Sequence, residues 1–246
     1  MPRSLRIWLR LRLEEFRSRV RALPRKFLRK AFEVLIEDLD MMDAVGSAAS
    51  SVKFAHEELK GATAFKSRLR LYRDVLPPAP FGEQDLFLEF GVFKGDSINR
   101  LAKLRPDVCW YGFDSFEGLP DAWGKGARKG YFDLKGVAPP VHDNVTLIKG
   151  LFEETLPDFV KQHGQQKVAF VHIDSDIYSA AKAIFDNIGP LLGPGCIILF
   201  DEFFNYRGWE NGEYKAFSEY AAKSGCAFRY LAYVSTGTQV ALRLTG

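Results

Sequence analysis

The sequence predicts an α/β protein built on a doubly wound, mostly parallel seven-stranded sheet with a helical N-terminal extension. Beyond residue 80, short apolar segments with strand character alternate with helical segments. The first five strands each lead into a loop or a helix, which favours parallel pairing. Only residues 235–238 separate the last two strands, too few for a crossover, so these two strands are expected to form an antiparallel hairpin.

The expected elements follow one another in a regular order. The strands are expected at residues 86–90, 108–113, 145–149, 168–173, 196–200, 227–234 and 239–244. The helices of the sheet domain are expected at residues 96–104, 153–163, 178–192 and 212–224, and those of the extension at residues 31–43 and 64–76. Because Pro77, Pro78 and Pro80 mark a boundary, we expect an N-terminal extension over residues 1–80 and a sheet domain over residues 81–246.

Composition argues against several classes of protein. The chain is 47% apolar and 26% charged, as in an ordinary globular domain, and no apolar run approaches the roughly 20 residues needed to cross a bilayer. The N-terminus lacks the continuous apolar stretch of a signal peptide. Three widely spaced cysteines argue against a disulfide framework and fit a reducing compartment. We therefore expect a cytoplasmic protein.

Positive charge is concentrated at the N-terminus. Residues 1–30 hold eleven Lys and Arg against two Glu, a net charge of +9 in a chain whose total is +3, so no nucleic-acid partner is expected for the acidic remainder. Apolar residues recur three or four apart in the same segment, as on one face of a helix, at Leu9, Leu13, Phe16, Val20, Leu23 and Phe27. Pro24 is expected to end or kink this helix. Such a helix forms contacts with the domain or in a homo-oligomer, or it lies on an anionic membrane surface, and both interpretations stay open.

The segment EFGVFKGDS, residues 89–97, follows the first strand and indicates the kind of ligand. A dinucleotide fingerprint starting at Gly91 needs glycines at positions 93 and 96, which are Phe and Asp here, and an Asp at a helix start repels phosphates. A ligand that carries cations but no phosphate, such as S-adenosylmethionine, fits better. Glu89 is placed to attract its ammonium group, Gly91 and Gly95 allow the backbone to approach, and Ser97 is placed to bind its carboxylate.

Asp114 ends the second strand, 23 residues after Gly91. An acid at about this separation accepts hydrogen bonds from both ribose hydroxyls in nucleoside-binding α/β folds. Asp114 is therefore expected to bind the ribose of the cofactor.

Two acidic pairs follow later strands. Asp174 and Asp176 come after the fourth strand, and Asp201 and Glu202 after the fifth. If those strands are neighbours, the carboxylates converge and need a cation, and ligands that are all oxygens favour Mg²⁺. We expect Asp174, Asp201 and Glu202 to bind the metal and Asp176 to remove a proton from a hydroxyl group. His172, inside the fourth strand, is expected to be a hydrogen-bonded interior residue.

Five segments together resemble the macrocin O-methyltransferase family of bacterial sugar O-methyltransferases. The segments are EFGVFKGDS, FDSFEGLP, KGLFEETLP, VHIDSDIYSA and GPGCIILFDEF, within residues 82–245. The resemblance implies the class I methyltransferase fold and dependence on S-adenosylmethionine and Mg²⁺. It also implies a glycan or small-molecule acceptor, methylated on a hydroxyl of a sugar or of a glycosylated small molecule.

The resemblance also implies roles for single residues. Glu89 and Gly91 correspond to the loop at the methionine end of the cofactor, Asp114 and Ser115 to the ribose site, and Gly150 and Phe152 to the border of the adenine. Asp174 and Asp201 correspond to metal ligands and Asp176 to the general base. Glu202 departs from the pattern, because the family usually has Asp there, and a longer side chain changes the ligand geometry.

Three other classes of function are alternatives to a methyltransferase. An Asp-X-Asp pair such as Asp174 and Asp176 also binds Mg²⁺ or Mn²⁺ in glycosyltransferases, but that interpretation leaves the 89–97 loop and the closing hairpin unexplained. A Mg²⁺ phosphohydrolase has its Asp-X-Asp after the first strand rather than the fourth. A membrane-recruited, non-catalytic scaffold with a methyltransferase-like domain is a further alternative, against which the intact acidic residues count.

Overall fold

The structure, a computed structural model, describes residues 24–78, 85–120 and 128–246. The chain forms two compact units, residues 1–46 and residues 47–246. The first unit holds helix α2 (Arg25–Glu37) and the start of helix α3 (Leu39–Glu57), and α2 begins directly after Pro24, where the sequence predicts an interruption. The second unit contains the sheet.

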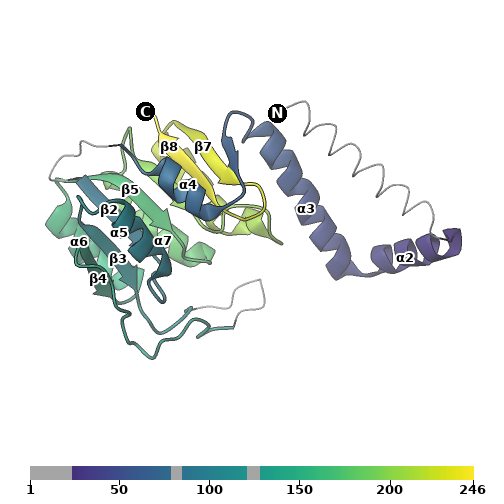
Figure 1. Cartoon of the computed structure of the whole chain (residues 1–246), viewed down its shortest axis with the longest axis horizontal. Helices are drawn as coiled ribbons and strands as arrows, with labels where there is room; N and C mark the ends of the chain where they lie inside the picture. Colours follow the sequence, from purple (N-terminus) through teal and green to yellow (C-terminus); the bar gives the residue numbers. More distant parts are fainter. Residues whose placement is uncertain (1–23, 79–84, 121–127) are drawn as a thin grey trace. The chain divides into compact units, whose positions relative to one another are not determined.

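Eight strands form one sheet in the order β1-β7-β8-β6-β5-β2-β3-β4 (Figure 1). The strands are β1 (Thr63–Phe65), β2 (Asp85–Phe90), β3 (Trp110–Asp114), β4 (Val145–Lys149), β5 (Lys167–Ile173), β6 (Ile197–Phe200), β7 (Phe228–Val234) and β8 (Val240–Leu244). Strand β8 runs antiparallel to both of its neighbours, and all other neighbouring pairs are parallel. The predicted fold class and the closing hairpin are therefore confirmed, and β5 and β6 are neighbours, as the convergence of the acidic pairs requires.

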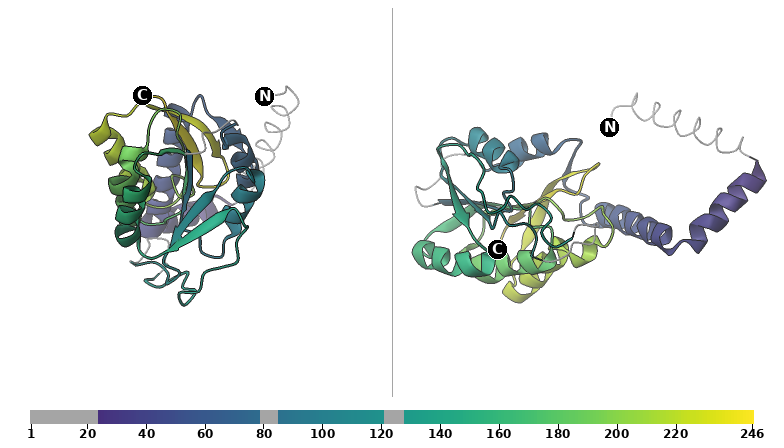
Figure 2. Two further views of the ribbon diagram at one scale, coloured as in Figure 1. Left: turned by 90° about the vertical axis from the view of Figure 1, so that its left-hand side faces the viewer. Right: turned by 90° about the horizontal axis from the view of Figure 1, so that it is seen from below.

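Helices cover both faces of this sheet (Figure 2). They are α4 (Arg68–Val75), α5 (Asp96–Leu104), α6 (Phe152–His163), α7 (Tyr178–Ile188) and α8 (Glu213–Ser224), with short 3₁₀ turns η1 (Gly189–Leu191) and η2 (Trp209–Asn211). Helices α6, α7 and α8 pack on one face, and α4 and α5 pack on the other. Side chains of β2 alternate between the two cores: Leu88 and Phe90 join the first, and Phe87 joins the second. Glu89 therefore points toward the α4 and α5 face.

The sheet has one strand more than the seven predicted. Residues 64–76, expected to be one helix, form the end of β1 and then helix α4. Strand β1 extends the sheet by pairing in parallel with β7. This strand was missed because three residues are too few to show a period of two, and because their backbone partners lie near the other end of the chain. Strand β1 lies at the edge of the sheet and is followed directly by α4, so the pairing of β1 helps to position α4.

Apolar side chains are exposed on α2 and α3, namely Phe27, Val34, Leu39, Met41, Met42, Val45 and Val52. Both a homo-oligomer contact and an anionic membrane surface would use such side chains, and both stay predictions. Residues 1–23, which carry most of the predicted basic helix, lie outside the described residues. Among the helices that the structure does describe, none combines the length and the apolar character needed to cross a bilayer.

Gly91 allows two loops of the domain to approach each other closely. Its φ is +90°, a left-handed conformation, and a Cβ atom added there would lie 1.7 Å from the carbonyl oxygen of Asp174. The loop after β2 therefore rests against the end of β5 because position 91 has no side chain. This contact fixes the distance between the 89–97 loop and the first acidic pair.

We expect the substitution Gly91→Ala to lower the free energy of unfolding by about 3 kcal/mol or more, because backbone must move on both loops. The measurement is urea unfolding followed by circular dichroism. Gly193→Ala is the matched control: an added Cβ there meets nothing within 4 Å, so its stability should stay within about 1 kcal/mol of wild type. Equal stability of the two variants would contradict the packing role of Gly91.

Candidate active site

A pocket of about 330 Å³ opens at the carboxyl ends of the parallel strands, where ligands of doubly wound sheets bind. Its walls come from the loops after β2, β3, β4, β5 and β6, and from helix α4. Ten of the twelve predicted site residues line it: Gly91, Ser97, Asp114, Ser115, Gly150, Phe152, Asp174, Asp176, Asp201 and Glu202. Glu89 and Gly95 do not. The roles of all twelve stay predictions.

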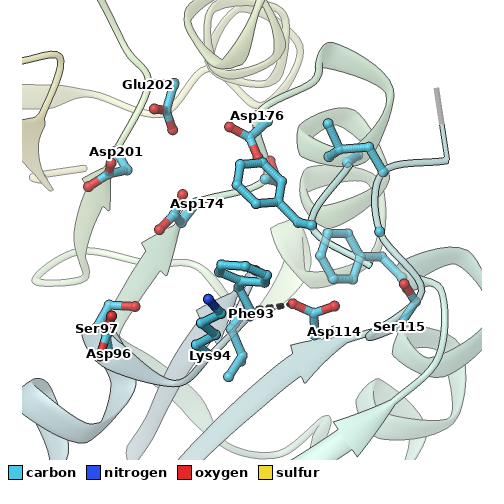
Figure 3. Close-up of a pocket in the computed structure, with 18 of the residues that line it drawn as sticks. Phe93, Lys94, Asp96, Ser97, Asp114, Ser115, Asp174, Asp176, Asp201 and Glu202 are labelled. Carbon is cyan, nitrogen blue, oxygen red and sulfur yellow. Dashed lines mark hydrogen bonds between the residues drawn. The ribbon is translucent and has the colours of Figure 1, made fainter. Parts of the chain in front are cut away.

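Asp114 connects the loops on the cofactor side of the pocket. Its Oδ2 accepts hydrogen bonds from the backbone N–H of Val92 (2.8 Å) and of Phe93 (2.7 Å), and its Oδ1 accepts one from Phe116 N–H (2.7 Å) (Figure 3). Phe93 is held with a positive φ of 48°. A carboxylate has about four lone pairs, so these three bonds leave limited capacity for the predicted ribose hydroxyls. The same residue thus shapes the loop and faces the ligand space.

Glu89 lies behind the pocket wall. It is fully buried, and its carboxylate accepts hydrogen bonds from Ser97 Oγ (2.9 Å) and from His172 Nδ1 (3.0 Å). Ser97 lines the pocket and Glu89 does not. The predicted attraction of Glu89 for an ammonium group would therefore act from behind the pocket wall, and it stays a prediction. Gly95 instead precedes α5 in a left-handed conformation, at φ 81°, which ends the loop and starts the helix.

Four carboxylates meet on the other side of the pocket, at the ends of β5 and β6 (Figure 3). Possible ligand atoms of Asp174, Asp176 and Glu202 all lie within 4.8 Å of one another, and so do those of His172, Asp174 and Asp201. Asp174 belongs to both groups. The two acidic pairs therefore converge as predicted, with Asp174 at the centre. Neither group contains the predicted ligands Asp174, Asp201 and Glu202 together, because Asp201 is grouped with His172 and Glu202 with Asp176.

The electrostatics of this cluster favour a bound cation. Burial, and then the charges of Asp201 and Glu202, raise the pKa of Asp174 well above its usual value. Burial alone would raise the pKa of Asp201 too, but His172 and Gln239 hold it below its usual value. Burial would lower the pKa of His172, yet Asp201 and Glu89 raise it well above 6.5. Without a cation the cluster therefore retains protons, which a divalent ion would displace.

Asp201 is held in place by residues from three elements. Its Oδ2 accepts a hydrogen bond from Gln239 Nε2 (3.1 Å), and its Oδ1 accepts one from the hydroxyl of Tyr72 (3.5 Å). His172 Nε2 lies 3.9 Å from the same Oδ1. The carboxylate is thus oriented before any ligand binds.

Four residues in or next to this site were not predicted from the sequence. Arg68 and Tyr72 line the pocket from α4, Gln239 holds Asp201 from the loop before β8, and Glu213 lies buried behind the acidic pairs at the start of α8. The only sequence signal was for Glu213, an acid in the first turn of a helix, and that position predicts a favourable helix-dipole interaction rather than a site. His172 is the buried, hydrogen-bonded residue that was expected.

The geometry has the arrangement of a class I methyltransferase, and the comparisons agree. Residues 88–203 match the family model described as a methyltransferase domain. A search of curated proteins finds no match to this chain. The fold and the domain match together define an S-adenosylmethionine-dependent methyltransferase.

Two solved structures share the fold over most of the chain. The structure of CalS11, a calicheamicin methyltransferase, is 23% identical with a TM-score of 0.54, and the match covers 90% of this chain and 86% of CalS11. The structure of the O-methyltransferase NovP is 18% identical with a TM-score of 0.51, and the match covers 73% of this chain and 80% of NovP. At these identities the likeness concerns the fold alone.

The pKa shifts predict a loss of stability with rising pH in the metal-free protein. His172, Asp174 and Glu213 have raised pKa values, about 8 for Glu213, so each binds more protons folded than unfolded. Stability therefore falls as pH rises toward those folded pKa values, and above pH 6.5, the usual pKa of a histidine, all three act in this direction. The lowered pKa of Asp201 acts only below its usual value of 3.8, outside this window.

The measurement is urea unfolding in EDTA at pH 6.5 and at about pH 8.5, where we expect lower stability at the higher pH. The variant Asp174→Asn should show a smaller fall because one of the three groups no longer titrates. A stability that stays constant or rises over this range in the wild type would contradict the assigned shifts.

Removing the Asp114 carboxylate should weaken binding of S-adenosylmethionine. Asp114→Ala loses the bonds to Val92 and Phe93 as well as the predicted ribose contacts, and we expect a cost of about 1.5–3 kcal/mol, or roughly 10–150-fold in Kd by calorimetry. Asp114→Asn keeps the side-chain volume and one acceptor oxygen, so its Kd for S-adenosylmethionine should lie between those of the wild type and of Asp114→Ala. Asp133→Ala is the control, because Asp133 also accepts a backbone bond, from Lys135, without lining the pocket. Wild-type affinity in Asp114→Ala would remove Asp114 from the cofactor site.

Proposed function

We propose that this chain is a divalent-metal-dependent O-methyltransferase that methylates a hydroxyl group of a sugar or of a glycosylated small molecule. S-adenosylmethionine is the donor, Asp174, Asp201 and Glu202 hold Mg²⁺, and Asp176 is the general base. One observation carries the proposal: the carboxylates that end β5 and β6 line the same pocket as Asp114 and the loop after β2.

The donor set fits a hard cation. Carboxylate oxygens supply the ligands, and the raised pKa of Asp174, caused by burial and by its acidic neighbours, is relieved when a cation binds. The cofactor side also fits, because Gly91, Asp114, Gly150 and Phe152 line one continuous part of the pocket wall. A divalent ion, when bound, acidifies and orients a hydroxyl group that it contacts.

Asp176 has the position and conformation of a general base. It is largely buried, lines the pocket and lies close to Asp174 and Glu202. Its φ is 63°, in the left-handed region, which directs the side chain out of the regular path of the loop after β5. In this role it would accept the proton of the acceptor hydroxyl as the oxygen attacks the methyl group and the bond between that methyl group and sulfur breaks.

An oxygen acceptor and a sugar are favoured by different observations. NovP, which shares the fold, is named an O-methyltransferase, and CalS11 is named for calicheamicin. The five sequence segments shared with the macrocin family favour a sugar. Arg68 and Tyr72, which precede residue 81, also line the pocket, so we expect acceptor identity to depend partly on residues outside the matched domain.

The first test is methyl transfer itself. Full-length protein is incubated with S-adenosylmethionine and pools of glycosides and glycans, and products are detected by the mass shift of one methyl group. We expect transfer with Mg²⁺, none in EDTA, and recovery when excess Mg²⁺ is added. Transfer that is unaffected by EDTA would remove the metal from the proposal. Calorimetry with a UDP-sugar tests the glycosyltransferase alternative, which tight binding would favour.

The second test separates the base from the ligands. Asp176→Asn should reduce turnover about 10²–10⁴-fold while the Kd of Mg²⁺ and of S-adenosylmethionine changes little. Asn tolerates the left-handed conformation, so the loop is retained. Asp186→Asn, which removes a surface carboxylate paired with Lys182, is the control and should be fully active. Loss of Mg²⁺ affinity in Asp176→Asn would instead make Asp176 a metal ligand beside Asp174 and Glu202.

A further inference from the structure

Glu213 is a buried acid that the proposed chemistry does not use. It is the first residue of α8 and is fully buried. It does not line the pocket, although Ser175 and Glu202, which it contacts, both do. Burial raises the pKa of Glu213 to about 8, and the charges of Asp176 and Asp201 add to this. A carboxylate here therefore costs folding free energy, because it adds negative charge behind a cluster that is already acidic.

The contacts of Glu213 connect the two acidic loops. Its Oε1 accepts hydrogen bonds from Ser175 N–H (3.0 Å) and from Ser175 Oγ (3.4 Å), in the loop after β5. Its Oε2 accepts one from Glu202 N–H (3.1 Å), in the loop after β6. Ser175 lies between Asp174 and Asp176, and Glu202 follows Asp201. One carboxylate thus holds the backbone of both acidic pairs.

We propose that Glu213 is a positioning residue that sets the separation of the two acidic loops and thereby assembles the metal site. The inference rests on the proposed function for the identity of the ligand. Two buried N–H groups need an acceptor, and one side chain that supplies an oxygen to each fixes their distance. A serine or an amide could satisfy one of these groups, but only a carboxylate offers two acceptor oxygens. The N-terminus of α8 partly offsets the cost of the charge.

The probe is Mn²⁺ alone, measured by calorimetry and by its electron paramagnetic resonance signal with full-length protein. Glu213→Gln keeps the volume and removes one acceptor oxygen, and Glu213→Ala removes both. We expect the Kd of Mn²⁺ to rise about 10–100-fold, more in Glu213→Ala, because outer residues that orient ligands have effects of this size. The Kd of S-adenosylmethionine should change less than about twofold, since Asp114 and the loop after β2 are untouched.

Glu219→Gln is the matched control. Glu219 lies on the same helix, is solvent-exposed and accepts a hydrogen bond from Tyr178 (2.7 Å). This variant should bind Mn²⁺ like the wild type. Wild-type Mn²⁺ affinity in Glu213→Ala would overturn the proposal, and so would an equal loss of Mn²⁺ and S-adenosylmethionine affinity, which marks a general structural role.

Hydrogen–deuterium exchange without metal gives a second, independent measurement. In both Glu213 variants, exchange should become faster in the segments 174–177 and 201–204 together, while strand β4 (Val145–Lys149), at the far edge of the sheet, stays as in the wild type. Unchanged exchange in either acidic loop would overturn the proposal. If the wild type binds no Mn²⁺, the metal-dependent part of the proposed function fails, and this exchange experiment still decides the role of Glu213.

Discussion

The structure of this site depends on one electrostatic constraint, the gathering of carboxylates where β5 and β6 end. Like charges at such distances disfavour ionisation in a buried place, and the opposite shifts of Asp174 and Asp201 express it. His172 and Gln239 hold the pKa of Asp201 below its usual value. His172 also lowers the pKa of Asp174, but burial and the charges of Asp201 and Glu202 outweigh it. A divalent cation bound there would lower the pKa of Asp174, because it would offset the charges of the neighbouring acids. This electrostatic balance is what the proposed divalent cation would change.

Several parts of the fold keep that cluster assembled against its own repulsion. Gly91 lets the loop after β2 rest on the carbonyl of Asp174, so this loop sets the position of the first acidic pair. Gln239 reaches Asp201 from the hairpin that closes the sheet. Thr238 donates a hydrogen bond from its Oγ1 to the Asp201 carbonyl (2.5 Å). Elements from the beginning, middle and end of the sheet domain thus converge on two adjacent strand ends.

Local patterns predicted the strands, most helices and the acidic pairs, because each of these signals lies within a few consecutive residues. Asp174 and Asp201 could be placed together from topology alone, since neighbouring parallel strands end at the same edge. Strand β1, Tyr72, Gln239 and Glu213 could not be found this way. Their roles come from contacts between residues 11 to 169 positions apart, for example Thr63 with Ala232, Tyr72 with Asp201, and Glu213 with Glu202. No periodicity or spacing in a single sequence carries such information.

Within the proposed function, charge balance favours Asp176 as a base rather than as a further metal ligand. Among the described residues that line the pocket, seven are acidic and three are basic, a formal charge of −4. A divalent ion and a cofactor with a net charge of +1 reduce this excess to −1. In the proposed reaction, transfer of the methyl group would remove the positive charge of the sulfonium, and the proton that Asp176 accepts from the acceptor hydroxyl would replace that charge. The total charge of the pocket would then be the same before and after transfer. A carboxylate that binds a cation is a weaker base than a carboxylate that does not. The general base is therefore expected to be an acid near the metal ligands that does not itself bind the metal.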